Sequence, residues 1–307
     1  MSATGYEAQR EKKRATLVSL LAAISLASLK LVAGLATGSL GVLAEAAHSG
    51  LDLVATLLTF LAIRLAARPP DEIHTYGHGK IENLAALAET LLLLLTCAWI
   101  VHEGVGRLVS GEAQVNLSFW AFAVLFLSIG VDFSRSRLLR RIARKYRSQA
   151  MEADALHFSA DMLSSLVVML GLAAVWCARF AEPGSLPHAL LIRADSLAAL
   201  VVSGIVAALS LRLGGRAVNA LLDASNSLYY KPIRAAVLAI PAVIEVRRLR
   251  LRDCGPICFL DLTIVLPHIM TLHQAHDVVS QAEAAIRKII PESDITIHYE
   301  PDEYKTQ

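Results

Sequence analysis

Six long apolar stretches constrain the fold of this chain more than any other feature of its sequence. A helix needs roughly 20 mostly apolar residues to cross a bilayer. Charged residues make up only 18% of the 307 residues, against about 25% in soluble domains. We therefore expect an α-helical membrane protein with six transmembrane helices. The expected spans are Ala15–Thr37, Leu40–Ala66, Ile81–Val109, Leu117–Leu138, Ala150–Phe180 and Ala189–Leu213.

Basic residues are concentrated in every second connection between these stretches. The flank Arg10–Arg14 and the connection Arg135–Arg147 are rich in Lys and Arg, whereas Thr37–Ser39 carries no charge. Because basic connections stay on the cytoplasmic side of a membrane, both termini are predicted to be cytoplasmic. The membrane would be the inner membrane of a bacterium or an organelle membrane of a eukaryote. A net charge of +2 gives no reason to expect a nucleic-acid partner.

The pattern of apolar residues changes near Ala224, where the long apolar stretches end. Residues 1–14 are expected to form a cytoplasmic tail, residues 15–223 the membrane domain and residues 224–307 a cytoplasmic domain. In the last of these, alternating and helical periodicities predict an αββαβ order, which is typical of a small α+β domain. Its elements are expected at Pro232–Ala242, Val243–Arg252, Ile257–Leu266, Leu272–Ile290 and Asp294–Tyr299.

Two His-x-x-x-Asp segments lie inside the second and fifth apolar stretches. Residues four apart share one face of a helix, so His48 with Asp52, and His157 with Asp161, each present an imidazole and a carboxylate together. Ionisable groups at membrane depth usually face an ion path or a partner. If the two helices touch, they offer two nitrogen and two oxygen ligands, a set that suits tetrahedral Zn²⁺. A helix-packing role is the alternative for these polar residues.

Charge balance indicates what such a site would exchange. Two carboxylates match a divalent ion, but without metal they would repel each other in a low dielectric. Protons are the natural replacement, and metal binding would release them. A site exposed alternately to the two sides of the membrane would then exchange metal for protons.

Other acidic residues also fall in the apolar stretches. Asp154 either orients the His157 ring as an acceptor or faces water near the start of its helix, and we favour the second interpretation. Asp132 has Arg135 one turn away, which predicts an ion pair. Glu89 also lies inside a stretch.

The connection between the second and third stretches carries three further ligand-type residues. Asp71, His74 and His78 fall within eight positions, with glycines that permit a tight backbone. Such spacing can hold a second metal, although a solvated polar loop has the same composition.

These motifs together resemble the cation diffusion facilitator family. The pattern His-x-x-Gly-His-Gly-Lys-x-Glu starting at His74, the paired His-x-x-x-Asp segments, the six spans and the C-terminal domain all match, so the resemblance covers nearly the whole chain. It implies a homodimeric metal/proton antiporter that moves divalent metal out of the cytoplasm, with a ferredoxin-like or metallochaperone-like C-terminal domain. The two-His, two-Asp site is similar to that of the zinc-selective members.

The resemblance also assigns roles to individual residues. It implies a transport site at His48, Asp52, His157 and Asp161, and a loop site at Asp71, His74 and His78. It further implies a charge interlock between Lys80 and Asp223, where two unrelated exposed charges are the alternative.

The C-terminal domain matches the family's metal-binding pattern only in part. His276, His298 and Glu300 stand at ligand positions, but Arg247 and Thr263 occupy positions where histidine is common. We expect one weaker metal site there, helped by His273 or Asp261, or else a dimerisation domain with surface histidines.

The sequence therefore favours a transporter, not an enzyme, with Zn²⁺ as its substrate and H⁺ as its counter-ion. Fe²⁺, Mn²⁺, Co²⁺ and Cd²⁺ are alternatives, because geometry and availability set selectivity among such metals. A non-transporting metal-binding scaffold is another class, but a scaffold needs no ligands at membrane depth. An intramembrane metalloprotease is disfavoured because no stretch contains His-Glu-x-x-His.

Overall fold

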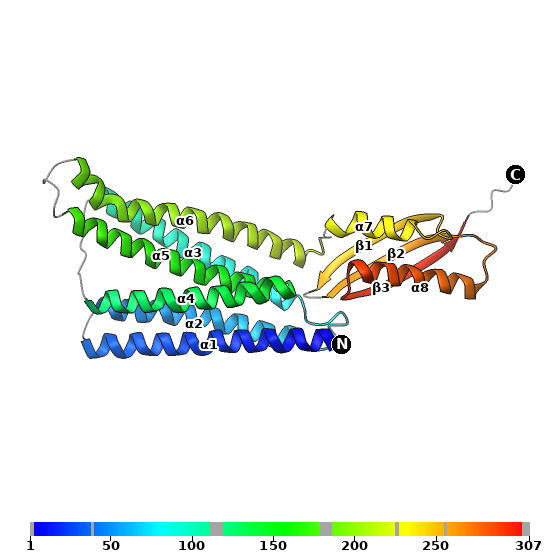
Figure 1. The fold of residues 1–307 in the computed structure, drawn as a ribbon, viewed down its shortest axis with the longest axis horizontal. Coiled ribbons are helices and arrows are strands. Elements are labelled where there is room, and N and C mark those ends of the chain that lie inside the picture. Colours follow the sequence, from blue (N-terminus) through cyan, green and yellow to red (C-terminus); the bar gives the residue numbers. More distant parts are fainter. Residues whose placement is uncertain are drawn as a thin grey trace. The chain divides into compact units, whose positions relative to one another are not determined.

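The computed structural model describes residues 3–37, 40–110, 119–178, 186–224, 227–254 and 257–302. The chain divides into a helical unit of residues 1–65 and 81–217 and a second unit of residues 66–80 and 218–307. The helical unit is an up-and-down bundle of long helices (Figure 1). These helices are α1 (Ala3–Thr37), α2 (Leu40–Ala66), α3 (Ile81–Ser110), α4 (Phe119–Tyr146), α5 (Gln149–Ala178) and α6 (Leu186–Leu221).

Several helices run beyond the apolar stretches. α1 begins twelve residues before Ala15, α4 ends at Tyr146 instead of Leu138, and α6 continues to Leu221. Hydropathy marks the part of a helix that lipid can cover, whereas backbone hydrogen bonds continue the helix into water. Among the described residues, four helices are long and apolar enough to cross a membrane, at Glu7–Ala36, His48–Ala66, Ile81–Gly106 and Ala199–Leu221.

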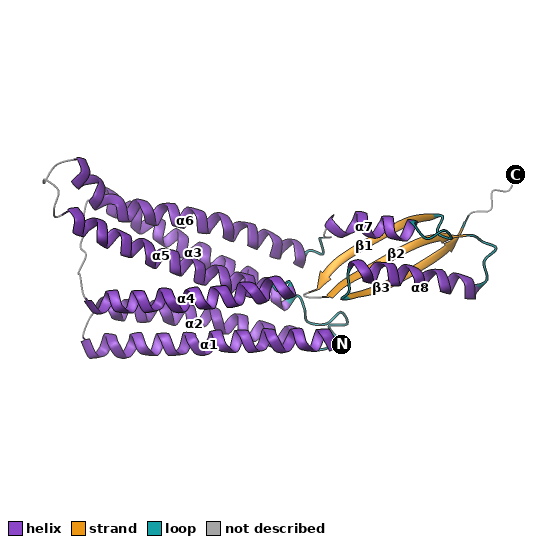
Figure 2. Ribbon diagram, in the orientation of Figure 1, coloured by secondary structure: helices purple, strands orange, loops and turns teal. Residues whose placement is uncertain are grey.

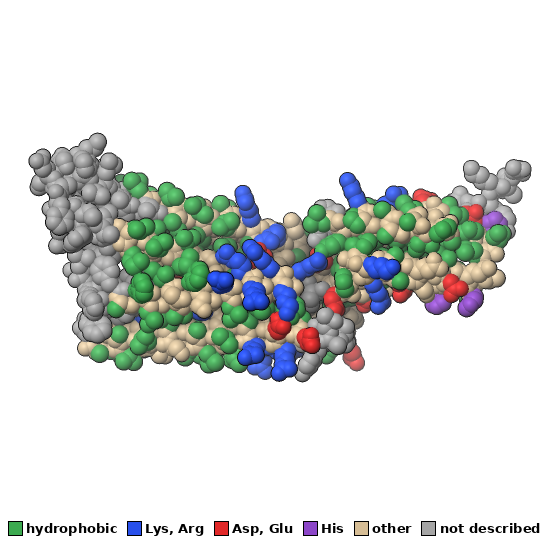
Figure 3. All heavy atoms as spheres, viewed as in Figure 1, with side chains coloured by type: hydrophobic (Ala, Val, Ile, Leu, Met, Phe, Trp, Pro, Cys, Tyr) green, Lys and Arg blue, Asp and Glu red, His purple; other side chains and the backbone are tan. Residues whose placement is uncertain are grey.

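The other two expected spans, in α4 and α5, reach into residues outside the described part of the chain. Leu117 and Phe180 are such residues. A count of six membrane-crossing helices therefore stays a prediction. Figure 3 shows Lys and Arg side chains gathered at one end of the helical unit, while hydrophobic side chains cover much of the remaining surface in this view.

The C-terminal part of the second unit has the predicted αββαβ order (Figure 2). Strands β1 and β2 pair antiparallel, β2 and β3 pair parallel, and the sheet order is β1-β2-β3. The expected β2 bounds are confirmed, whereas α7 begins five residues before Pro232. Residues 255 and 256, between β1 and β2, lie outside the described residues. The elements are α7 (Ser227–Leu238), β1 (Glu245–Cys254), β2 (Ile257–Leu266), α8 (Leu272–Ile289) and β3 (Ser293–Pro301).

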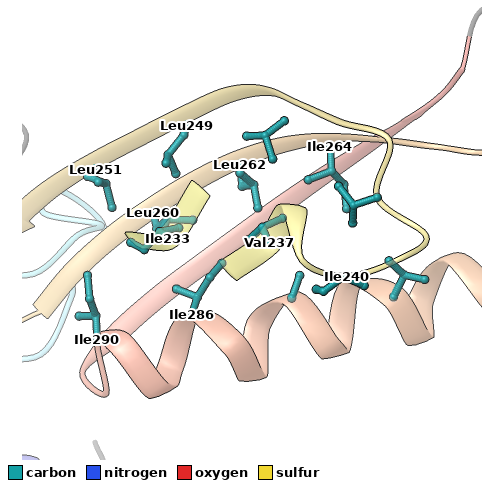
Figure 4. Packing of buried hydrophobic residues seen from close by; sticks show 14 of the residues in the cluster. Ile233, Val237, Ile240, Leu249, Leu251, Leu260, Leu262, Ile264, Ile286 and Ile290 are labelled. Carbon is teal, nitrogen blue, oxygen red and sulfur yellow. The ribbon is translucent and has the colours of Figure 1, made fainter. Parts of the chain in front are cut away.

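This domain has its own hydrophobic core between the helices and the sheet (Figure 4). Alternate residues of β2, such as Leu260, Leu262 and Ile264, are buried because successive side chains of a strand point to opposite faces. α8 contributes Ile286 from its apolar face. The N-cap Thr271 accepts a hydrogen bond from the backbone N–H of Gln274, which completes a capping box and fixes where α8 begins.

Candidate metal centre

α2 and α5 bring the two His-x-x-x-Asp segments face to face. His157 Nε2 lies 3.2 Å from Asp52 Oδ1 and 3.3 Å from Asp161 Oδ2. His48 Nε2 lies 3.9 Å from Asp52 Oδ1 and 3.9 Å from Asp161 Oδ1. Each imidazole thus contacts both carboxylates, one from its own helix and one from the other helix.

The 3.2 and 3.3 Å distances from His157 match the spacing of ligand atoms around a small metal ion, whereas the 3.9 Å distances from His48 are longer. Zinc bonds of about 2.0–2.1 Å to nitrogen and oxygen place tetrahedral ligands about 3.3 Å apart. The side chain of His157 is 9% exposed and that of His48 is 44% exposed, so the cluster has one buried and one open side. Asp161 Oδ2 makes no hydrogen bond within the described structure, which leaves a buried oxygen available to a cation. His48, Asp52 and Asp161 each offer a ligand atom within 4.8 Å of the other two, so these three could hold a metal ion, and His157 lies against both carboxylates.

α4 supplies a basic group beside this cluster. The buried Arg135 guanidinium lies 3.6 Å from Asp132 Oδ1, as expected for that pair. It also donates to Ser19 Oγ and Thr56 Oγ1, at 3.1 and 2.9 Å, and its Cζ lies 3.5 Å from the centre of the Phe158 ring. These contacts position Arg135 by hydrogen bonds and a cation–π interaction and keep its charge near the cluster.

Three buried polar contacts were not predicted from the sequence. Lys12 Nζ lies 2.5 Å from Glu82 Oε1, and Ser148 donates a hydrogen bond to the other oxygen of Glu82. Lys30 donates to Ser49 Oγ at 2.8 Å, next to His48 in the chain. A lone charge in an apolar stretch indicates that a partner exists, but the sequence does not say which helix provides it.

The expectation that Asp154 faces water is wrong. Its side chain is 0% exposed, and neither carboxylate oxygen has a hydrogen-bond partner within the described structure, so it makes no hydrogen bond to His157 either. The position close to the start of α5 suggested water, but α3 packs against this part of α5 and covers it.

Asp71, His74 and His78 form a second cluster in the second unit. His74 Nδ1 lies 3.3 Å from Asp71 Oδ1, and His78 Nε2 lies 3.3 Å from Asp71 Oδ2. The backbone N–H groups of Ile73 and His74 donate to Asp71 Oδ1, which curls the loop around the carboxylate. Gly77 closes the turn with φ +79°, a conformation that favours glycine.

The loop carboxylate is ionised more easily than an ordinary aspartate. The hydrogen bond from the His74 backbone N–H lowers the pKa of Asp71, and the Ile73 N–H and the two histidine rings add to this. An ionised carboxylate beside two imidazoles is a donor set that suits a divalent metal.

The loop packs on the strands of the C-terminal domain. The Tyr76 ring meets the Phe259 ring edge-on at 5.1 Å, and Arg252 Cζ lies 3.7 Å from the centre of the Tyr76 ring. The loop cluster therefore lies on a fixed support inside the second unit.

Lys80 and Asp223 lie together as the interlock requires. Lys80 Nζ is 2.7 Å from Asp223 Oδ1 and donates to the Leu221 carbonyl at 3.2 Å. Both charged side chains are partly exposed. Lys80 thus ties the start of α3 to the end of α6.

The structure does not bring His276, His298 and Glu300 into one cluster within a single chain. His298 Nε2 lies 3.7 Å from Glu300 Oε1, but His276 is exposed on α8 and joins no metal-ligand group among the described residues. Arg247 takes the Glu300 carboxylate, with Nη1 2.5 Å from Oε2. Arg247 sits at a break in the β1–β2 register between Val246 and Arg248, and such a bulge redirects a side chain.

Comparisons with known proteins agree with this architecture. Residues 16–222 match the cation efflux transmembrane domain, and residues 226–302 match the cytoplasmic domain of cation efflux proteins. This chain belongs to the cation diffusion facilitator family. It is 32% identical over 289 residues to the cation-efflux pump FieF of Cronobacter sakazakii and 33% identical over 294 residues to that of Yersinia enterocolitica. Each alignment covers 94% of this chain and 92% of the relative.

The family assignment fixes the general activity. The protein is an integral membrane transporter that exports divalent cations. A quarter of this chain is also similar to a solved MamM CTD, at 24% identity and a TM-score of 0.24, covering 25% of this chain and 100% of the other.

Proposed function

We propose that this facilitator exports Zn²⁺ from the cytoplasm in exchange for protons. The observation that carries the proposal is the ring of donors from α2 and α5, where each histidine nitrogen lies 3.2–3.9 Å from both aspartate carboxylates. Two nitrogens and two carboxylate oxygens give a neutral complex with a divalent ion and suit the tetrahedral preference of zinc. Fe²⁺, Mn²⁺, Co²⁺ and Cd²⁺ are the competing substrates.

Proton exchange follows from the same donors. When the metal leaves, Asp52 and Asp161 lose the ion that balanced their charges, and their mutual repulsion favours uptake of protons by the centre. When metal returns, the ligands must lose those protons. A bundle that opens the centre to one side at a time would couple the two flows.

The remaining sites have supporting roles in this proposal. Asp71, His74 and His78 would hold a second metal beside the C-terminal domain, and the Lys80–Asp223 pair would hold the start of α3 to the end of α6. Both termini would be cytoplasmic, and two copies of the chain would pair through their cytoplasmic domains. His298 and Glu300 would contribute to a metal site only if His276 of a second copy completed it.

Transport in reconstituted vesicles tests the proposal. Zinc added outside vesicles that carry a zinc dye and a pH dye should produce zinc uptake with proton counterflow. Asp52→Asn and Asp161→Asn should each lower the zinc flux at least about 100-fold, because losing a mere supporting contact to a ligand already costs 10–100-fold. The exposed Asp277→Asn, on α8, is the matched control. Zinc flux without proton counterflow, or full flux in Asp52→Asn, would contradict the proposal.

A further inference from the structure

Glu89 and Asp154 form a second pair of carboxylates beside the metal centre. Neither residue is one of its candidate ligands. Asp154 precedes His157 by one turn of α5, on the same face. Glu89 comes from α3, which packs against α5 at this level through Ala86 and Ala153. Glu89 is 1% exposed and Asp154 is 0% exposed. The pair lies between the metal centre and the N-terminal end of α5, the end of the bundle where basic side chains gather (Figure 3).

Most of the oxygens of this pair lack a partner. Thr59, on α2, donates a hydrogen bond to Glu89 Oε1. Glu89 Oε2 and both oxygens of Asp154 have no hydrogen-bond partner within the described structure. An ionised carboxylate buried in this way is strongly unfavourable unless a cation or a proton neutralises it.

The basic side chains nearby already have other partners. Arg135 donates to Ser19 and Thr56 and faces Asp132, so it acts on Asp154 only at a distance. Lys30 donates to Ser49. The pair therefore has no direct ion partner among the described residues. The charged groups that act on it are Asp52, Asp161, His157 and Arg135.

A count of charges around the metal centre indicates what neutralises the two buried carboxylates. In the described part of this region, Arg135 and Lys30 face five carboxylates, so three negative charges remain when all are ionised. With the metal centre empty, protons on these side chains supply the positive charge that balances them. The five carboxylates are Asp52, Asp132, Asp154, Asp161 and Glu89.

We propose that Glu89 and Asp154 share one proton and form a proton-carrying pair that is distinct from the metal ligands. The proposal rests on the proton exchange proposed above and assigns one of its protons to named atoms. The proton sits on a carboxyl oxygen of one of the two side chains. When metal occupies the neighbouring centre, repulsion favours release of this proton to water at the basic end of the bundle. When the metal leaves, the pair takes a proton back.

The proposed pair can be tested in the full-length protein by substitutions that keep the shape of each side chain but remove its carboxyl group. Glu89→Gln and Asp154→Asn, singly and together, should lower the number of protons returned per zinc ion and slow exchange at least about tenfold, as expected when a proton-transfer group is lost. Zinc binding at equilibrium should stay within about threefold of the native chain, because the four ligands are untouched. The exposed Asp277→Asn, on α8, is the control because Asp277 lies outside the five counted carboxylates.

Infrared difference spectra give a readout that needs no transport. Adding zinc to the native protein should change a band of a protonated carboxyl group, and that band should be absent from Glu89→Gln and from Asp154→Asn. An unchanged band, or an unchanged proton-to-zinc ratio in both single variants, would overturn the proposal. Loss of one bound zinc ion from either variant would also overturn it, because the pair would then be a metal site. If the native protein returned no protons at all, the proposed exchange would fail, while the infrared band would still report on the pair.

Discussion

Lys12 and Glu82 form an ion pair whose Nζ and Oε1 atoms lie 2.5 Å apart with side chains 0% and 1% exposed. The pair joins α1 to the first turn of α3, and Ser148 binds the second Glu82 oxygen just before α5. Two helices and the residue before a third thus meet at one buried carboxylate. Glu82 is also the last residue of the family pattern that begins at His74.

Breaking this pair should destabilise the protein strongly. Removing one partner of a buried pair leaves an uncompensated charge and costs about 3–5 kcal/mol. We expect Lys12→Met to lower the midpoint of thermal unfolding in detergent, and Lys12→Met with Glu82→Gln to recover part of the loss. The exposed pair of Lys145 and Glu11, at 2.9 Å, is the control, and Lys145→Met should cost at most about 1 kcal/mol. Equal effects at the two pairs would contradict this prediction.

Adjacent glycines in α6 should respond differently to alanine. A Cβ on Gly214 would lie 2.8 Å from Thr90 Cγ2, whereas a Cβ on Gly215 would meet no atom within 4 Å. Gly214→Ala should therefore force α6 away from α3 and cost about 1–3 kcal/mol. Gly215→Ala should be neutral or should stabilise the helix by up to about 1 kcal/mol. Thermal unfolding of both variants checks the difference, and the reverse order would show that the α3–α6 contact is wrong.

The C-terminal domain should lose stability in acid through Asp302. The His268 backbone N–H donates to its carboxylate at 2.6 Å and the His268 ring lies at 2.7 Å, which lowers the pKa of Asp302. A lowered pKa stabilises the fold above the ordinary value of about 3.9. That contribution disappears as the pH falls through the folded-state pKa.

Amide hydrogen exchange in β3, measured over a series of acidic pH values, checks the prediction for Asp302. Protection should decrease below about pH 4 in the native chain, and Asp302→Asn should make it less dependent on pH. A native profile that stays flat in acid would contradict the assignment. Asp294→Asn, at the start of the same strand, is the control.

Arg247 should decide whether the C-terminal domain binds zinc. Its guanidinium forms an ion pair with the Glu300 carboxylate and lies 3.6 Å from Glu245 Oε2. Arg247→His should free Glu300 and place an imidazole near His298, so we expect additional zinc binding by equilibrium dialysis of the full chain. Arg250→His, at an exposed position of the same strand, should bind no additional zinc. Equal binding by the two variants would show that Arg247 does not block a site.

The sequence predicted the members of the candidate metal centre because helical periodicity places residues four apart on one face. Two copies of the pattern specified His48, Asp52, His157 and Asp161 before any contact between α2 and α5 was known. The contact between those helices itself followed only from the family resemblance and from the chemistry of the donors. Whether a metal binds there is the subject of the transport experiment.

Burial inside the bundle could not be predicted in the same way. Hydropathy gives the apolar stretches but not which helices touch, so the partner of Lys12 and the enclosure of Asp154 emerged only from the structure. Helix ends were also missed, because the helices continue into water beyond Ala15 and Leu138. In the C-terminal domain, alternation gave the β2 bounds, but the register break at Arg247 leaves no clear mark on that pattern.

At the register break in β1, the side chain of Arg247 places a positive charge that does not depend on the supply of metal. A chelator can strip an ion from the imidazoles and carboxylates of the loop, but it cannot remove a guanidinium that is covalently part of the chain. The positive charge between Glu245 and Glu300 is therefore permanent. The contacts of Arg247 with Glu245 and Glu300 should therefore be the same in starved and in metal-loaded cells, whereas the loop cluster would gain and lose its ion.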